Sequence, residues 1–127
     1  MHILSIALGG AIGATLRFIV SGAAYDRFGT DFPYGTLAVN VIGCFLIGFL
    51  SYAFSESVVS PNTRALILTG GLGAFTTFST YGLESVYLWR DGEMQTALLN
   101  ILANNVIGLL FVVAGLVLAR FVFVQIR

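Results

Sequence analysis

The stretch GGLGAFTTFSTYG, residues 70–82, determines how the rest of the sequence is interpreted. It lies inside a long apolar segment, yet three of its first four residues are glycine, and hydroxyl and aromatic side chains crowd together over residues 76–81. Lipid offers no hydrogen bonds, so a backbone that breaks within a membrane must be buried in protein or line a water-filled cavity. Because broken membrane helices place carbonyl groups at ion sites, the stretch predicts an ion-handling element. A continuous, closely packed helix is the alternative, since glycine, serine and threonine also let membrane helices approach each other.

The composition of the chain is that of a membrane protein. Of its 127 residues, 57% are hydrophobic and only 9% are charged, against about 25% charged residues in an ordinary soluble chain. The formal net charge is zero, so no basic surface indicates nucleic-acid binding. The lone histidine, His2, and the lone cysteine, Cys44, have no partners at metal-ligand or disulfide spacing, and the sequence carries no P-loop or nucleophile motif. We therefore expect a membrane protein that is not an enzyme.

Four apolar segments are long enough to cross a bilayer, which takes about 20 helical residues. They cover approximately residues 3–24, 35–54, 64–88 and 94–123. The first is expected to be a retained span, because no basic region precedes its apolar run as it would in a signal peptide. Residues 1–127 are thus predicted to form a single all-α membrane domain of four transmembrane helices, with the third helix broken at its glycine-rich stretch.

Small and polar residues recur at helical spacing along the predicted spans. In the first span they fall every four residues, at Ser5, Gly9, Gly13 and Arg17. Residues four apart share one face of a helix, and the two glycines form a G-x-x-x-G packing motif. Similar stripes run along the second and fourth spans. A bundle this small leaves little room for a central pore, so we expect the stripes to meet another subunit.

The arginines are balanced across the predicted topology. With four spans, both termini and the second loop lie on one side of the membrane, and there is no lysine in the chain. Three arginines fall on each side, Arg64, Arg120 and Arg127 against Arg17, Arg27 and Arg90. Orientation normally follows an excess of Lys and Arg in cytoplasmic loops. The balance predicts insertion in both orientations and makes an antiparallel homodimer possible; the alternative is that a weak bias still selects one orientation.

Several side chains within the spans are candidates for contact with an ion. An intramembrane charge is a functional candidate by default, and Arg17 suits an anion, although it can also snorkel to the interface. The Asn40 amide can donate to an anion or bond across helices. Phe78 and Tyr81 share one helix face and offer ring edges of partial positive charge. Glu84, close to Arg90 in sequence, is expected to be paired or interfacial rather than a proton carrier.

Three sequence blocks carry a resemblance to a known family. GGAIGATLRF (9–18), GTLAVNVIG (35–43) and GGLGAFTTFSTYGLE (70–84) resemble the signature blocks of the Fluc (CrcB-type) family of small fluoride channels. The similarity extends over nearly the whole chain. It implies an antiparallel, dual-topology homodimer in the cell inner membrane that exports fluoride passively through two pores. It also implies a structural sodium ion at the dimer centre, held by backbone carbonyls at the break in the third helix.

The resemblance also implies roles for individual residues. The fluoride pore would be lined by Asn40, Phe78, Ser79, Thr80 and Tyr81. The sodium ligands would be the carbonyl oxygens of Gly73 and Thr76, and Arg17 resembles the arginine of the family's first helix. Two positions depart from the family pattern: Tyr81 replaces the usual phenylalanine, and no tyrosine follows Trp89 in the last span, where Asn100 or Asn104 would substitute for it.

Two other functions fit the same span pattern. A small proton-coupled exporter of the multidrug type would have similar size and dual topology, but it needs a membrane-embedded carboxylate. The first span contains Arg17 and no acidic residue, which argues against that function. A structural assembly partner without transport activity would explain the glycine stripes as packing faces. It would leave the cluster of hydroxyl and aromatic side chains over residues 76–81 unexplained.

Overall fold

The structure is a computed structural model that describes residues 1–125, and every element in that range is helical. The elements in chain order are α1 His2–Phe28, α2 Tyr34–Ser55, α3 Pro61–Arg64, η1 Ala65–Leu72, α4 Gly73–Phe75, α5 Phe78–Arg90, α6 Met94–Leu102, η2 Ala103–Ile107 and α7 Gly108–Gln125. The two η elements are π-helical. The prediction of an all-α chain is therefore confirmed.

The helices form four rods, of which the third is divided. Three helices are long and apolar enough to cross a membrane: α1, α2 and the continuous run Met94–Gln125. The remaining rod consists of α3, η1 and α4 in one piece and α5 in a second. Pro61, which lies between the predicted spans 35–54 and 64–88, is the first residue of α3. Ser60 caps that helix through its hydroxyl, which accepts from the Thr63 N–H at 3.1 Å.

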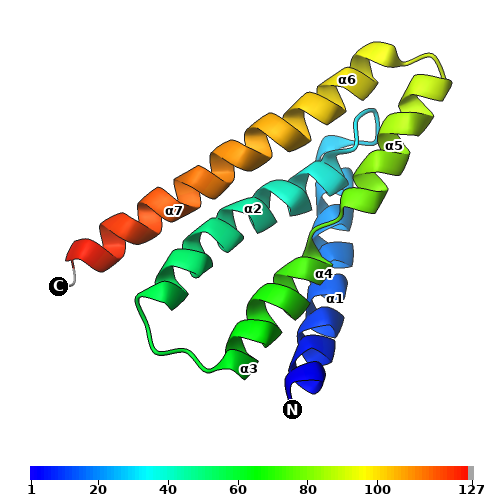
Figure 1. Cartoon of the computed structure of the whole chain (residues 1–127). Helices are drawn as coiled ribbons and strands as arrows, with labels where there is room; N and C mark the ends of the chain where they lie inside the picture. The colour runs from blue at the N-terminus through cyan, green and yellow to red at the C-terminus, as the bar shows by residue number, and fades with distance from the viewer. Residues whose placement is uncertain (126–127) are drawn as a thin grey trace.

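The rods run alternately up and down (Figure 1). Both termini and the loop between α2 and α3 lie at one end of the molecule, while the other two connections lie at the opposite end. Two helix pairs are in extensive contact, α2 with α7 and α1 with η1, and α1 also packs against α2. This arrangement agrees with the predicted order of loops and spans.

Glycine allows α1 and η1 to pack backbone against backbone. A Cβ atom added at Gly9 would overlap the carbonyl oxygen of Leu66, and one at Gly13 would overlap that of Gly71. In the reverse direction, a Cβ at Gly70 would overlap the carbonyl oxygen of Ile6. The G-x-x-x-G motif is thus satisfied within the chain, and the prediction that this stripe meets another subunit is wrong for its two glycines.

The contact between α2 and α7 follows the same rule. A Cβ at Gly48 would overlap the Val112 carbonyl oxygen, and one at Gly115 would overlap the Phe45 carbonyl oxygen. The stripe predicted along the second span therefore also packs inside the chain at Gly48, and Gly115, which no predicted stripe included, is its counterpart on α7. Large apolar side chains elsewhere on α7, including Leu109, remain exposed. They provide surface for lipid or for another protein chain.

Alanine at Gly9 should lower the thermal midpoint of the detergent-purified protein. The new methyl group would overlap a backbone oxygen of η1, and overpacking of this kind costs about 1–3 kcal/mol. Gly10 is the matched control, because a Cβ there meets nothing within 4 Å. Gly10→Ala should keep or raise the midpoint, since alanine is the better helix former. Equal midpoints for the two variants would contradict the close contact of α1 with η1.

Candidate ion-binding site

The third rod breaks at Thr76 and Thr77. Both residues have extended backbone angles, φ −84° and ψ 160° at Thr76 and φ −149° and ψ 112° at Thr77. The break lies inside the predicted stretch but not at its glycines, which stay helical, Gly70 in η1 and Gly73 at the start of α4. The prediction of a break at the glycines is corrected accordingly. Glycine serves close packing here, while the threonines end one helix and begin the next.

The side chain of Thr77 explains why a new helix starts at this point. Its hydroxyl oxygen accepts from the Thr80 N–H at 3.2 Å, so Thr77 is the N-cap of α5. The same hydroxyl donates to Thr80 Oγ1 at 2.9 Å and lies 3.4 Å from Ser79 Oγ. An N-cap residue keeps an extended conformation while its side chain covers a free N–H of the first turn. The capping pattern therefore fixes the position of the break.

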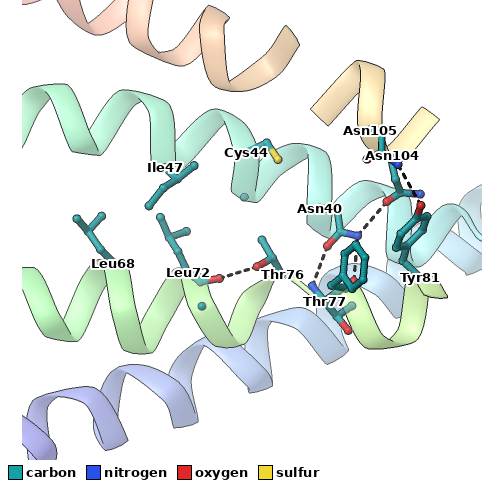
Figure 2. A pocket seen from close by; sticks show the side chains of 13 residues that line it. Asn40, Cys44, Ile47, Leu68, Leu72, Thr76, Thr77, Tyr81, Asn104 and Asn105 are labelled. Atoms are coloured by element: carbon teal, nitrogen blue, oxygen red, sulfur yellow. Dashed lines mark hydrogen bonds between the residues drawn. The ribbon is translucent and has the colours of Figure 1, made fainter. Parts of the chain in front are cut away.

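Asn40, on α2, supplies the hydrogen bonds that the backbone loses at the break (Figure 2). Its Oδ1 accepts from the Thr77 N–H at 2.8 Å, and its Nδ2 donates to the Thr77 carbonyl oxygen at 3.1 Å. Nδ2 also donates to Asn104 Oδ1 at 2.9 Å. One side chain thus satisfies both backbone groups of Thr77. Both hydrogens of the Asn40 amide are used inside the chain.

The same bonds release two carbonyl groups of the third rod. In a continuous α-helix the Gly73 carbonyl would accept from Thr77 N–H, and the Thr76 carbonyl would accept from Thr80 N–H. Here the Thr77 N–H goes to Asn40 and the Thr80 N–H goes to the Thr77 hydroxyl. The carbonyl oxygens of Gly73 and Thr76 therefore lose their α-helical partners, as ligands of a cation require.

A cavity of about 350 Å³, the first cavity, lies against the break, between α2, the divided rod and the fourth rod. Its thirteen lining residues are shown in Figure 2. Phe78 and Tyr81 lie together on its wall, with ring centroids 5.2 Å apart and planes at 64°, an edge-to-face contact. Tyr81 is 8% exposed, whereas Phe78 is 80% exposed. Of the aromatic pair, Tyr81 is therefore buried inside the chain and Phe78 lies on its surface.

Asparagines of the fourth rod extend the hydrogen bonds of Asn40 into the protein. Asn104 Nδ2 donates to Asn100 Oδ1 at 2.9 Å, and Asn100 Nδ2 donates to Ser85 Oγ at 2.9 Å. Asn100 is completely buried. We call the linked side chains Asn40, Asn104, Asn100 and Ser85 the asparagine chain. It connects α2, α5 and the fourth rod at the level of the break.

A cavity of about 450 Å³, the second cavity, adjoins the break beside α1. Its lining includes Arg17, Thr80 and Glu84. Glu84 Oε1 accepts from Tyr25 Oη at 3.2 Å and from Thr36 Oγ1 at 2.8 Å. Its buried Oε2 has no hydrogen-bond partner within the part of the chain that the structure describes. Glu84 is therefore paired with hydroxyls rather than with a neighbouring arginine.

The structure divides the predicted site residues between the two cavities. Asn40, Phe78 and Tyr81 line the first cavity, whereas Thr80 and Arg17 line the second. Ser79 is exposed and lines neither of them. The hydroxyls of Ser79 and Thr80 therefore do not continue the wall formed by the aromatic pair. Thr77 is the residue that lines both cavities.

Sequence reasoning missed Thr77 and Asn105 as site residues. Thr77 had a usable signal, because threonine is one of the residues preferred at the N-cap of a helix. Asn105 donates from Nδ2 to the Tyr81 hydroxyl at 3.0 Å. It follows Asn104 directly, and in a regular α-helix the two side chains would point about 100° apart. Both asparagines lie in the π-helical turn η2 and line the first cavity, and hydropathy contains no signal for such a turn.

A divided helix whose backbone is satisfied by side chains, with a partly polar cavity on each side, is a feature of membrane proteins that handle ions. Together with three helices long and apolar enough to span a bilayer, it defines the class as a multi-pass membrane transport protein. Comparison with known proteins narrows this class to one family.

Residues 4–116 match the family model described as CrcB-like protein, Camphor Resistance (CrcB). A protein of Magnetococcus marinus named fluoride-specific ion channel FluC is 46% identical over 123 residues, covering 96% of this chain and 100% of the relative. A protein of the same name from Aquifex aeolicus is 47% identical over 119 residues, covering 93% and 96%. A third, from Parabacteroides distasonis, is 44% identical over 127 residues, covering 100% and 99%. The chain belongs to the CrcB-like family, as the resemblance indicated.

Replacing Asn40 by leucine should destabilise the region of the break. Leucine is of similar size but leaves the N–H and carbonyl of Thr77 without partners, and each buried unsatisfied group costs about 1–3 kcal/mol. We expect a lower thermal midpoint and faster amide exchange over residues 76–81 by hydrogen-exchange mass spectrometry. Asn62→Leu is the control, because Asn62 is exposed and bonds to His2 at 3.3 Å. Equal exchange rates over residues 76–81 in the two variants would refute the role assigned to Asn40.

Proposed function

We propose that this protein is a fluoride-specific ion channel that lets fluoride leave the cytoplasm passively through the cell inner membrane and so lowers its toxicity. One observation carries the proposal: the chain matches relatives of that name at 44–47% identity along nearly the full length of both partners. The family is not one of enzymes. Export follows because HF that enters a cell from acidic surroundings ionises in the neutral cytoplasm and is trapped there as an anion.

The polar groups at the break suit a small, strongly hydrated anion. A selective pathway must replace the water around the ion with donors held at close range. The hydroxyls of Ser79 and Thr80 and the ring edges of Phe78 and Tyr81 are the groups proposed for this task. Asn40 contributes in a different way from the others. Both of its amide hydrogens are engaged, so it can donate to an ion only by exchanging its bond to Asn104.

The second cavity suits the entry of an anion into this pathway. Arg17 on its wall is a permanent positive charge, which raises the local concentration of anions. Thr80 lines the same cavity, and its N–H and hydroxyl are both bonded to Thr77. We propose that fluoride passes from the neighbourhood of Arg17 past these hydroxyls. Glu84 shares the cavity, and its Oε1 is bonded to the Tyr25 and Thr36 hydroxyls.

A structural sodium ion fits the carbonyl groups released at the break. Sodium is a hard cation, for which oxygen ligands are preferred. The Gly73 and Thr76 carbonyls have lost their α-helical partners, and no group of three or more His, Cys, Asp or Glu side chains within residues 1–125 competes as a metal site. These two carbonyls, from each of two chains, would hold the ion at the dimer centre. Its positive charge would join the broken helices of the two subunits.

The working unit is proposed to be an antiparallel homodimer of single four-span domains, residues 1–127, with the divided rod as the fourth crossing. Two observations support it. Phe78 is 80% exposed although it belongs to the aromatic pair, so a second chain is needed to enclose the cavity wall. The arginines are balanced between the two ends of the bundle, although Arg127 lies outside the residues that the structure describes.

Fluoride efflux from liposomes that contain the purified protein tests the function directly. Wild-type protein should release fluoride rapidly, and Phe78→Ile should release little while remaining dimeric and well folded. Isoleucine keeps an apolar side chain of broadly similar bulk but removes the positive ring edge.

Two outcomes of the efflux assay would count against the proposal. Wild-type flux from a well-folded Phe78→Ile protein would make the aromatic pair ordinary packing and move the pore elsewhere. Efflux that requires a proton gradient would favour the proton-coupled exporter over a channel.

Reporter fusions test the dual orientation. A C-terminal reporter should be detected on both sides of the cell membrane, because neither side carries an excess of positive charge. Two arginines added to the loop between Ser55 and Pro61 should shift insertion toward one orientation and lower fluoride efflux when that variant is expressed alone. A C-terminus found on one side only in the wild type would rule out the antiparallel homodimer.

A further inference from the structure

The hydrogen bond between Asn105 and Tyr81 has a defined direction. Asn105 Nδ2 lies 2.8 Å from the Ile101 carbonyl oxygen and 3.0 Å from the Tyr81 hydroxyl oxygen. A carbonyl oxygen can only accept, so the nitrogen end of the amide must face Ile101. The same nitrogen faces Tyr81 (Figure 2). In this bond Asn105 is therefore the donor, and the Tyr81 oxygen is the acceptor.

This direction leaves the hydroxyl hydrogen of Tyr81 available. A phenol has a single hydrogen to donate, and it is not used in the bond with Asn105. Within residues 1–125 no acceptor for it is found among the hydrogen bonds of Tyr81. Tyr81 is 8% exposed and lines the first cavity. A buried donor without an acceptor is costly, so an occupant of the cavity is the natural partner for this hydrogen.

We propose that the Tyr81 hydroxyl is a hydrogen-bond donor to the anion in the first cavity, and that Asn105 is the residue that positions it. This inference rests on the proposed fluoride channel. Fluoride is a strong acceptor, and the hydroxyl stands beside the edge-to-face contact of Phe78 with Tyr81. The donor and the positive ring edges therefore act on the same part of the cavity wall. Tyr81 contributes both kinds of group, whereas a phenylalanine would contribute the ring edge alone.

Asn105 and its neighbour Asn104 belong to the π-helical turn η2, Ala103–Ile107. Both of these consecutive asparagines line the first cavity. Asn104 is committed to the asparagine chain through its bonds with Asn40 and Asn100. Asn105 is left free of that chain and bonds to Tyr81 instead. The two neighbouring asparagines thus have separate tasks, one at the break and one at the aromatic pair.

The test is the fluoride dependence of efflux from liposomes, measured with a fluoride electrode over a range of internal concentrations. Tyr81→Phe keeps the ring and removes the hydroxyl. We expect the half-saturating fluoride concentration to rise about tenfold, the usual effect of losing one hydrogen bond to an anion, while the maximal flux stays within about twofold. An unchanged half-saturating concentration in a conducting Tyr81→Phe protein would overturn the inference.

A double-mutant cycle tests the role of Asn105. Asn105→Leu should raise the half-saturating concentration about threefold in the wild-type background and leave it unchanged in the Tyr81→Phe background, because Asn105 acts through the hydroxyl. A merely structural asparagine would have the same effect in both backgrounds, and that result would overturn the positioning role. Asn105→Ser, which is polar but too short to reach the phenol, is a second variant for the same cycle if the leucine protein does not fold.

The matched control is Tyr52→Phe. Tyr52 is on α2, contacts the ring of Phe123 with a centroid distance of 6.5 Å, and lines neither cavity. Its loss of a hydroxyl should leave the half-saturating concentration unchanged. A wild-type protein without fluoride flux would overturn the proposed function and this inference together. A conducting wild type with an unaltered Tyr81→Phe variant would overturn this inference alone.

Discussion

The two hydrogen bonds between the Asn40 side chain and the backbone of Thr77 are the interaction on which the rest of the structure depends. A helix that breaks in an apolar environment leaves an N–H and a carbonyl that lipid cannot satisfy, and each costs several kcal/mol. An amide side chain carries a donor and an acceptor side by side, so it can satisfy both groups of one residue at once. Asn40 does so at 2.8 and 3.1 Å. Its second amide hydrogen then reaches Asn104, which links the break to the fourth rod.

Glycine contacts bring these groups into range of each other. Gly48 and Gly115 let α2 and α7 touch through their backbones, and Gly9 and Gly13 do the same for α1 and η1. A single added methyl at any of these positions would overlap a backbone oxygen. A separation of α2 from the fourth rod by one methyl radius would lengthen the 2.9 Å bond between Asn40 and Asn104 beyond about 3.2 Å, the upper end of the usual N–H···O range. The apolar packing and the polar site are therefore two consequences of the same close approach.

Some features of the structure follow from local sequence, whereas the hydrogen bonds of Asn40 and the glycine contacts depend on neighbouring helices; this difference explains which features could be predicted. Hydropathy and loop composition predicted the rods to within a few residues at most ends, because lipid imposes one requirement on every span. The stretch 70–82 was correctly identified as interrupted, but the interruption was assigned to glycine. Whether glycine breaks a helix or packs it depends on the neighbouring backbone, and only the contact of Gly70 with α1 decides that. For the same reason the sequence predicted a second subunit as the partner of the glycine stripes, whereas their glycines contact helices of the same chain. The separation of Thr80 from the aromatic pair follows from the period of α5, because Thr80 lies two residues after Phe78 and one before Tyr81 and so faces another side of the helix.

The hydroxyls at the break share one arrangement that relates the two cavities. Thr77 Oγ1 donates its hydrogen to Thr80 Oγ1, so the Thr80 oxygen accepts inside the chain and its own hydrogen is left for the second cavity. The Tyr81 oxygen accepts from Asn105 and keeps its hydrogen for the first cavity. In each case an internal donor occupies one lone pair of the oxygen and leaves its hydrogen free for the cavity. An acceptor-only ion such as fluoride would then meet one hydroxyl donor on either side of Thr77.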